Sequence, residues 1–231
     1  LLKPNKGMGT LIGSFSDIDP RTVTVIGAGV AGTEAIKKAI ENRARLKIID
    51  LSSERLILAY SKGIFPWFEI DQPILWWSPD PRFVLFPNKL KISKSMNQFL
   101  KKNTYRITYN KAFKDVIQHC SKISRTGQEG TWITKDMISS YCKLHELGFA
   151  KSVEVWDKED LVGGLYGIDL GNNIFCGESM FSKESNTSKL ALISLLKNND
   201  YKLIDCQVFT DHLESLGAEE ISREMFLEII N

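Results

Sequence analysis

The chain has 231 residues, of which 43% are hydrophobic and 25% are charged, and its formal net charge is +2. This length suits one large domain with a smaller annex, and the composition is ordinary for a globular protein. No apolar run approaches the roughly 20 residues of a membrane helix and no signal-peptide pattern opens the chain, so we expect a cytoplasmic protein without a membrane partner. The four cysteines form no C-x-x-C pair, which predicts free thiols rather than disulfides or a metal site.

The first fifty residues predict a strand, a glycine-rich turn, a helix and a second strand. Gly27, Gly29 and Gly32 fit the pattern G-x-G-x-x-G, and Asp50 follows the second strand. In a Rossmann-like βαβ unit such glycines let the backbone approach a pyrophosphate, and a carboxylate at this spacing bonds a ribose. The segment from about residue 6 to 50 resembles the NAD-binding domain of alanine dehydrogenases. Nothing that follows supplies the other half of a dinucleotide-binding sheet, so we expect no cofactor and no NAD-dependent activity.

Residues 52–62 predict a helix that ends at Gly63 in left-handed geometry. An aromatic and proline-rich stretch follows at residues 64–82. Its tryptophans fit either a core plug around rigid turns or a shelf on which a nucleobase stacks.

Residues 82–114 contain nine lysines and arginines and no acidic residue. A solvated run of charge is usually mixed in sign, so an acid-free tract of this length favours a polyanion partner such as nucleic acid.

From residue 153 onward, two apolar runs separated by turns at 157–160 and 171–173 predict an antiparallel meander that leads into residues 174–182. Residues 189–196 are apolar on too many sides for a surface helix and should lie against the sheet. The predicted order is β-β-β-α-β, an acyltransferase-like α/β core.

Two of these apolar runs end at acids. Glu178 stands in IFCGESMFS, and Asp205 and Gln207 stand in LIDCQ. Strands of open α/β sheets deliver polar residues to a cleft at their carboxyl ends, so the two acids suggest chemistry. The alternative for each is a strand-end acid that caps backbone amides.

Residues 51–231 resemble one family closely, the leucyl/phenylalanyl-tRNA–protein transferases. The resemblance lies in the motifs DLSSERLILAYSKGIFPWF, ILWWSPDPR, KISKSM, EGTWITKDM, LHELG, SVEVW, LVGGLYG, FCGESMFS, SKLAL and LIDCQ. It implies a small N-terminal domain at 51–80 and a GNAT (acetyltransferase-like) domain at 81–231, with the Rossmann-like segment 1–50 as an annex. It also implies an enzyme that moves Leu or Phe from aminoacyl-tRNA to proteins that begin with Arg or Lys, which tags them for degradation.

The resemblance also implies roles for residues. Asp205 would orient the Gln207 amide toward the attacking amine, and Glu178, as an unpaired carboxylate, would bind the cationic end of the acceptor. Leu165, Met180 and Ile204 would form the slot for the Leu or Phe side chain, although each could equally be plain core. Trp67 and Trp132 would hold the terminal adenosine. The candidates for phosphate contacts to the tRNA are Lys91, Lys94, Lys101 and Lys102.

The sequence departs from the family in three places. The family's own N-terminal strands are replaced by the dehydrogenase-like segment, the connection from Lys189 to Lys202 is shorter, and Thr210 stands where an asparagine is common. The alternative to a transferase is therefore a catalytically impaired hybrid or an NAD-binding module of the alanine dehydrogenase type. We expect a monomer.

Overall fold

A computed structural model describes residues 10–11, 22–26, 45–68, 74–102, 104–123 and 131–231. The helices are α2 (Ser53–Ser61), η2 (Pro87–Lys89), α3 (Lys94–Lys102), α4 (Phe113–Ser121), α5 (Lys135–Glu146), α6 (Thr187–Lys197), α7 (Asp211–Glu214) and α8 (Arg223–Ile230). The strands are β1 (Thr10–Leu11), β2 (Thr22–Ile26), β3 (Arg45–Ile49), β4 (Phe65–Pro66), β5 (Trp76–Ser78), β6 (Arg82–Leu85), β7 (Arg106–Tyr109), β8 (Ala150–Asp157), β9 (Asp160–Asp169), β10 (Ile174–Ser182), β11 (Leu203–Gln207) and β12 (Glu219–Ile221).

A seven-stranded sheet forms the centre of the fold, in the order β12-β6-β11-β10-β9-β8-β7. Strands β10 and β11 pair in parallel, and their neighbours pair antiparallel. A parallel pair needs a crossover connection, which α6 supplies. The predicted β-β-β-α-β order, here β8-β9-β10-α6-β11, is confirmed, and the fold is α/β with a mixed sheet.

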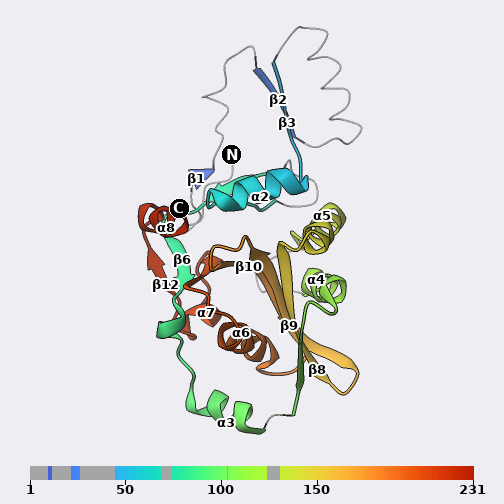
Figure 1. The fold of residues 1–231 in the computed structure, drawn as a ribbon, viewed down its shortest axis with the longest axis vertical. Coiled ribbons are helices and arrows are strands. Elements are labelled where there is room, and N and C mark those ends of the chain that lie inside the picture. The colour runs from blue at the N-terminus through green and yellow to red at the C-terminus, as the bar shows by residue number, and fades with distance from the viewer. Residues whose placement is uncertain (1–9, 12–21, 27–44, 69–73, 103, 124–130) are drawn as a thin grey trace.

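Helices cover both faces of this sheet. Figure 1 shows α4 and α5 on one side of β8–β10 and α6 on the other. Neighbouring residues of β9 alternate between these faces, because successive side chains of a strand point to opposite sides. Tyr166 is buried with Val116 of α4 and Tyr141 of α5, whereas Leu165 is buried with Leu192 of α6. The predicted packing of the apolar helix against the sheet is confirmed.

The N-terminal part contributes two small sheets. Strands β1, β5 and β4 form one of them, and β2 and β3 pair in parallel as the predicted βαβ unit requires. Gly27, Gly29 and Gly32 lie outside the described residues. The Asp50 carboxylate accepts a hydrogen bond from the backbone N–H of Ser52 at 3.1 Å, just before α2.

Helix α2 and its glycine stop are confirmed. The backbone at Gly63 has φ +69°, and an added Cβ there would lie 2.8 Å from the Phe226 ring of α8. The four cysteines are free thiols. Among the described residues, no helix combines the length and apolar character needed to cross a bilayer.

Gly163 of β9 lets α6 approach the sheet closely. A Cβ built on Gly163 would lie 2.4 Å from the Thr187 side chain, at the first residue of α6. Thr187 is fully buried and donates to the Val162 carbonyl at 3.0 Å, so it has little freedom to move. The start of α6 therefore depends on the absence of a side chain at residue 163.

We predict that Gly163→Ala destabilises the protein by about 1–3 kcal/mol, the usual cost of overpacking a core. Chemical denaturation of the two proteins measures the difference. Gly177→Ala is the matched control, because a Cβ there would meet its nearest neighbour at an ordinary 3.5 Å. Equal stability of the wild type and Gly163→Ala would show that α6 shifts without cost.

Candidate functional site

A cavity of about 760 Å³ lies where β10 and β11 part. The two strands pair from Ile174 opposite Leu203 to Cys176 opposite Asp205. Beyond that point β10 continues to Ser182 against β9 alone. Residues on both sides of the parting line the cavity, including Gly177 on β10 and Cys206 on β11. This is the carboxyl-end position at which open α/β sheets bind ligands.

The walls of the cavity are mostly apolar. The five residues predicted to bind substrate all line it: Trp67, Trp132, Leu165, Met180 and Ile204. The Leu165 and Ile204 side chains are almost fully buried, whereas Met180 and both tryptophans are partly exposed. The backbone of Trp67 is fixed by Trp77, whose indole N–H donates a hydrogen bond to the Trp67 carbonyl at 2.7 Å.

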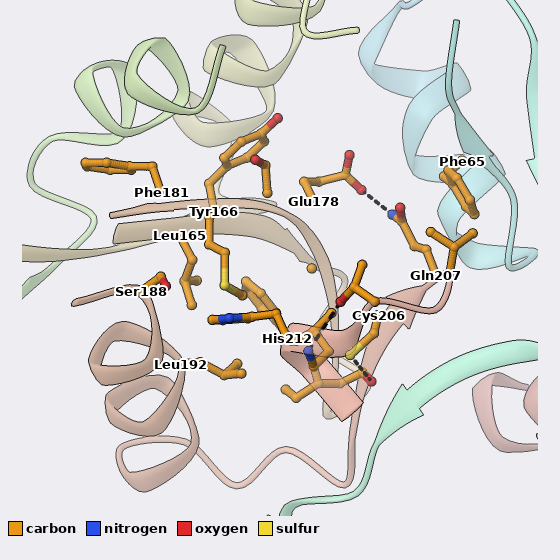
Figure 2. Close-up of a pocket in the computed structure, with 18 of the residues that line it drawn as sticks. Phe65, Leu165, Tyr166, Glu178, Phe181, Ser188, Leu192, Cys206, Gln207 and His212 are labelled. Carbon is orange, nitrogen blue, oxygen red and sulfur yellow. Dashed lines mark hydrogen bonds between the residues drawn. The ribbon is translucent and has the colours of Figure 1, made fainter. Parts of the chain in front are cut away.

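Two irregularities in the sheet aim polar side chains at this cavity. The register of β10 on β9 shifts between Gly177 and Ser179, and that of β11 on β6 shifts between Asp205 and Gln207. Such bulges redirect side chains and are common beside active sites. Glu178 lies within the first irregularity and Gln207 directly follows the second, and their side chains meet. The Gln207 Nε2 donates to Glu178 Oε1 at 2.7 Å, as Figure 2 shows.

Glu178 is buried, with 8% of its surface exposed, and is not the unpaired carboxylate that we expected. It accepts hydrogen bonds from the Tyr60 hydroxyl at 2.6 Å and the Tyr141 hydroxyl at 3.1 Å, besides the Gln207 amide. The two tyrosine hydroxyls also bond to each other. The difference arises because α2 and α5, far apart in sequence, bring neutral donors to the same carboxylate.

Sequence reasoning missed Tyr60 and Tyr141. Both lie within helices, where a buried tyrosine is normally core, and neither stands at a strand end or in a catalytic pattern. The one available signal was chemical: a buried Tyr hydroxyl needs a partner. Nothing in the sequence identified Glu178 as that partner.

The electrostatics of Glu178 follow from its neutral surroundings. Burial raises the pKa of its carboxyl from 4.5 to about 7, although the hydrogen bonds from Tyr60, Gln207 and Tyr141 oppose this rise. The nearby Asp205 carboxylate adds a smaller upward effect on the pKa. Burial beside Glu178 also raises the pKa values of both tyrosines well above 10, so they remain donors.

Asp205 does not contact the Gln207 side chain, contrary to our expectation. Its carboxylate is fully buried and pairs with Arg82, with Nε to Oδ1 at 2.7 Å and Nη2 to Oδ2 at 2.6 Å. Oδ1 also accepts from the backbone N–H of Gln207 at 3.0 Å. The alternative in which Asp205 caps a backbone amide is therefore correct in part. Its other partner is Arg82, which the sequence analysis assigned to the basic tract.

Arg82 was counted with the basic tract, but it is 1% exposed and takes no part in a basic surface. The four lysines predicted to contact tRNA are exposed: Lys91, Lys94, Lys101 and Lys102. Three of them lie on α3, which Figure 1 shows at the end of the molecule away from α2. Among the described residues, none of these four lysines forms an ion pair with a carboxylate.

The site is thus an apolar cavity in a mixed α/β fold, with a buried carboxylate–amide pair at its edge. The comparisons with known proteins identify the family. Residues 84–231 match the leucyl/phenylalanyl-tRNA protein transferase family, and residues 49–80 match its N-terminal domain. The chain belongs to the leucyl/phenylalanyl-tRNA–protein transferase family and is a transferase.

Three relatives bear the name leucyl/phenylalanyl-tRNA–protein transferase. The protein from Flavobacterium johnsoniae is 62% identical over 78% of this chain and 86% of its own length. That from Flavobacterium psychrophilum is 59% identical over 78% and 87%. The one from Shigella dysenteriae is 53% identical over 79% and 77%. These matches do not favour the alternative of a hybrid or NAD-binding module.

Residues 1–63 also match the C-terminal domain of alanine dehydrogenase/PNT, which agrees with the similarity noted in the sequence. Among solved structures, a GCN5-related N-acetyltransferase from Kribbella flavida matches with a TM-score of 0.37 and 10% identity, over 83% of this chain and 71% of that one. A similarity at that level does not decide the fold.

We predict that Glu178 makes the stability of the protein depend on pH. Its pKa in the folded state, about 7, lies above the ordinary value of 4.5. Its contribution to stability is therefore fully present below about pH 4.5 and is lost as the pH rises to about 7, because only the unfolded chain then releases the proton easily.

Glu178→Gln cannot ionise and should lack this part of the decline, so the difference between variant and wild type should grow in the variant's favour from pH 4.5 to 7. Thermal melts across this range measure it. Glu228→Gln, an exposed residue of α8, is the control. Parallel pH curves for wild type and Glu178→Gln would contradict the raised pKa.

Proposed function

We propose that this protein moves leucine or phenylalanine from aminoacyl-tRNA to the α-amine of proteins that begin with Arg or Lys. The observation that carries the proposal is the Glu178–Gln207 pair, which lies at the edge of an apolar cavity. The family supplies the aminoacyl donor, and the cavity supplies places for the apolar side chain and for a polar acceptor beside it.

The apolar wall suits the donor side chain. Leu165, Met180 and Ile204 line the cavity with surfaces that carry no charge. Methionine is flexible, so one slot can accept both the branched leucine and the flat phenylalanine. Trp67 and Trp132 offer aromatic faces for the terminal adenosine, and base stacking of this kind contributes ~1–3 kcal/mol per base.

Gln207 is suited to receive the attacking amine. Its Nε2 is fixed on Glu178, and its Oε1 has no hydrogen-bond donor among the described residues. An α-amine with a pKa of ~7.7–8.0 is already partly neutral at pH 7, so little general-base help is needed. Orientation contributes effective molarities of ~10⁵–10⁸ M, against ~10²–10⁴-fold for acid–base catalysis. Gln207 therefore acts by positioning the amine rather than by removing its proton outright.

Glu178 is suited to the acceptor's cation. Its carboxylate receives three neutral donors and no cation from the described residues, and burial raises its pKa to about 7. An Arg or Lys side chain would supply the missing positive charge in a site of low dielectric. Acceptors with a neutral first residue would leave the carboxylate uncompensated.

The decisive test is transfer of labelled phenylalanine from Phe-tRNA to peptides that differ in their first residue. We expect transfer to peptides starting with Arg or Lys, and little to otherwise identical peptides starting with Ala or Glu. Glu178→Gln should raise KM for the Arg peptide and leave KM for Phe-tRNA unchanged, since the new amide keeps an oxygen that can accept from Gln207 Nε2 but has no charge to pair with the acceptor. Absence of transfer by the folded wild type, or equal effects of Glu178→Gln on both substrates, would refute the assignment.

We predict that α3 forms part of the tRNA-binding surface. The variant Lys101→Glu/Lys102→Glu should weaken tRNA binding and reduce the slope of log affinity against log salt by about 0.7–0.9 for each phosphate that the protein no longer neutralises. The variant Lys143→Glu/Lys197→Glu changes the charge equally at exposed residues of α5 and α6. Equal slopes for the two variants would place the tRNA elsewhere.

A further inference from the structure

Arg82 is a buried cation that joins four distant segments of the chain. Its guanidinium carbon lies 5.0 Å from the centre of the Phe65 ring and 4.4 Å from that of Phe226. Its Nη1 donates to the Gly63 carbonyl at 3.1 Å, and its two remaining donor groups pair with Asp205. Arg82, on β6, thus contacts three other segments: residues 63–65, β11 and α8.

Asp205 cannot meet a substrate in this arrangement. Its side chain is 0% exposed, and it does not line the cavity. Both carboxylate oxygens pair with Arg82, Oδ1 also accepts from the backbone N–H of Gln207, and the carboxylate has the Cys176 thiol as a further hydrogen-bond neighbour. Apart from its electrostatic effect on Glu178, the contact of Asp205 that leads to the cavity is the one with the backbone of Gln207.

That backbone is strained. Gln207 has φ +67°, a left-handed conformation that brings the Cβ of a non-glycine residue too close to the following carbonyl oxygen. The strain coincides with the register shift of β11 on β6, and it turns the Gln207 side chain toward Glu178. A strained backbone conformation is maintained only where surrounding contacts stabilise it. The hydrogen bond from the Gln207 N–H to Asp205 Oδ1 is one such contact.

We propose that Arg82 is a positioning residue of the transfer site. Its ion pair with Asp205 holds the Gln207 backbone in the left-handed conformation and so presents the Gln207 amide to Glu178. The consequence for catalysis rests on the proposed function, in which Gln207 orients the attacking amine. Asp205 is then an anchor for the backbone rather than a relay to the Gln207 amide.

A purely structural role is the alternative, since Arg82 contacts so many segments. Removing one partner of a buried ion pair destabilises strongly, so a loss of stability does not distinguish the two roles. The two roles differ in whether a conservative substitution at residue 82 alters the Gln207 side chain. A positioning role predicts a change at the Gln207 side chain that an equally buried network elsewhere does not produce.

The test variant is Arg82→Lys, which keeps the charge and removes the two-pronged pairing. Glu154→Gln is the matched control, because Glu154 is also 0% exposed and bonds to Thr108 and Ser152, but lines no part of the cavity. Both variants should lower Tm. Arg82→Lys alone should lower kcat, by tenfold or more, with KM for Phe-tRNA unchanged. In a Gln207→Ala background it should lower kcat no further, because the two residues act as one unit.

A second readout needs no activity. The chain has five glutamines, so ¹⁵N-glutamine labelling gives few side-chain amide signals. The signal that disappears in Gln207→Ala is the side-chain amide of Gln207. Arg82→Lys should move this signal and Glu154→Gln should not. If Arg82→Lys does not fold, Asp205→Asn replaces it, since it keeps the shape and weakens the pair.

The outcomes separate the two proposals. A folded wild type without transfer activity refutes the proposed function, while the amide signal still decides whether Arg82 positions Gln207. An unmoved Gln207 signal in a folded Arg82→Lys or Asp205→Asn protein overturns the inference. So does a loss of kcat in Arg82→Lys that is the same with and without Gln207.

Discussion

Two carboxylates are buried beside each other on the parallel strands β10 and β11, and the site depends on how each is compensated. A charge taken from water into a protein interior needs a partner or it is neutralised. Asp205 has a full counter-charge in Arg82, together with a backbone N–H. Glu178 has three neutral donors and no cation among the described residues, and its burial raises the pKa of its carboxyl to about 7. Asp205 is thus paired with a cation, whereas Glu178 has no cation among the described residues and borders the cavity.

This difference links acceptor binding to protonation in the proposed reaction. A cation within about 4–6 Å lowers the pKa of a carboxyl group. The entry of an Arg or Lys side chain would therefore complete the ionisation of Glu178, and the acceptor would bind less well below pH 7. Ionised Glu178 is also the better acceptor for the Gln207 Nε2, so the arrival of the cation tightens the hold on the amide that faces the amine.

The sequence predicted what depends on local pattern. The meander β8–β9–β10, the buried helix α6, the helix α2 with its stop at Gly63 and the acids at the ends of apolar runs all follow from periodicity and turn residues. The family motifs added the residues of the cavity wall. The partners of the acids were not predictable, because Tyr60, Tyr141 and Arg82 reach them across 118, 37 and 123 residues of chain. Patterns of charge along the sequence do not show which cation is buried.

The tract from residue 82 to 114 illustrates that limit. Its first member, Arg82, is buried and contacts two aromatic rings, whereas its lysines on α3 are exposed. An arginine suits the buried place because its flat guanidinium stacks on rings while its edge forms two parallel hydrogen bonds with a carboxylate. A lysine at residue 82 could carry the charge but could not make both interactions. Residues of one sign in one stretch of sequence therefore occupy two different environments, and we propose a different role for each: attraction of a polyanion at the surface, and restraint of a strained backbone at the cavity.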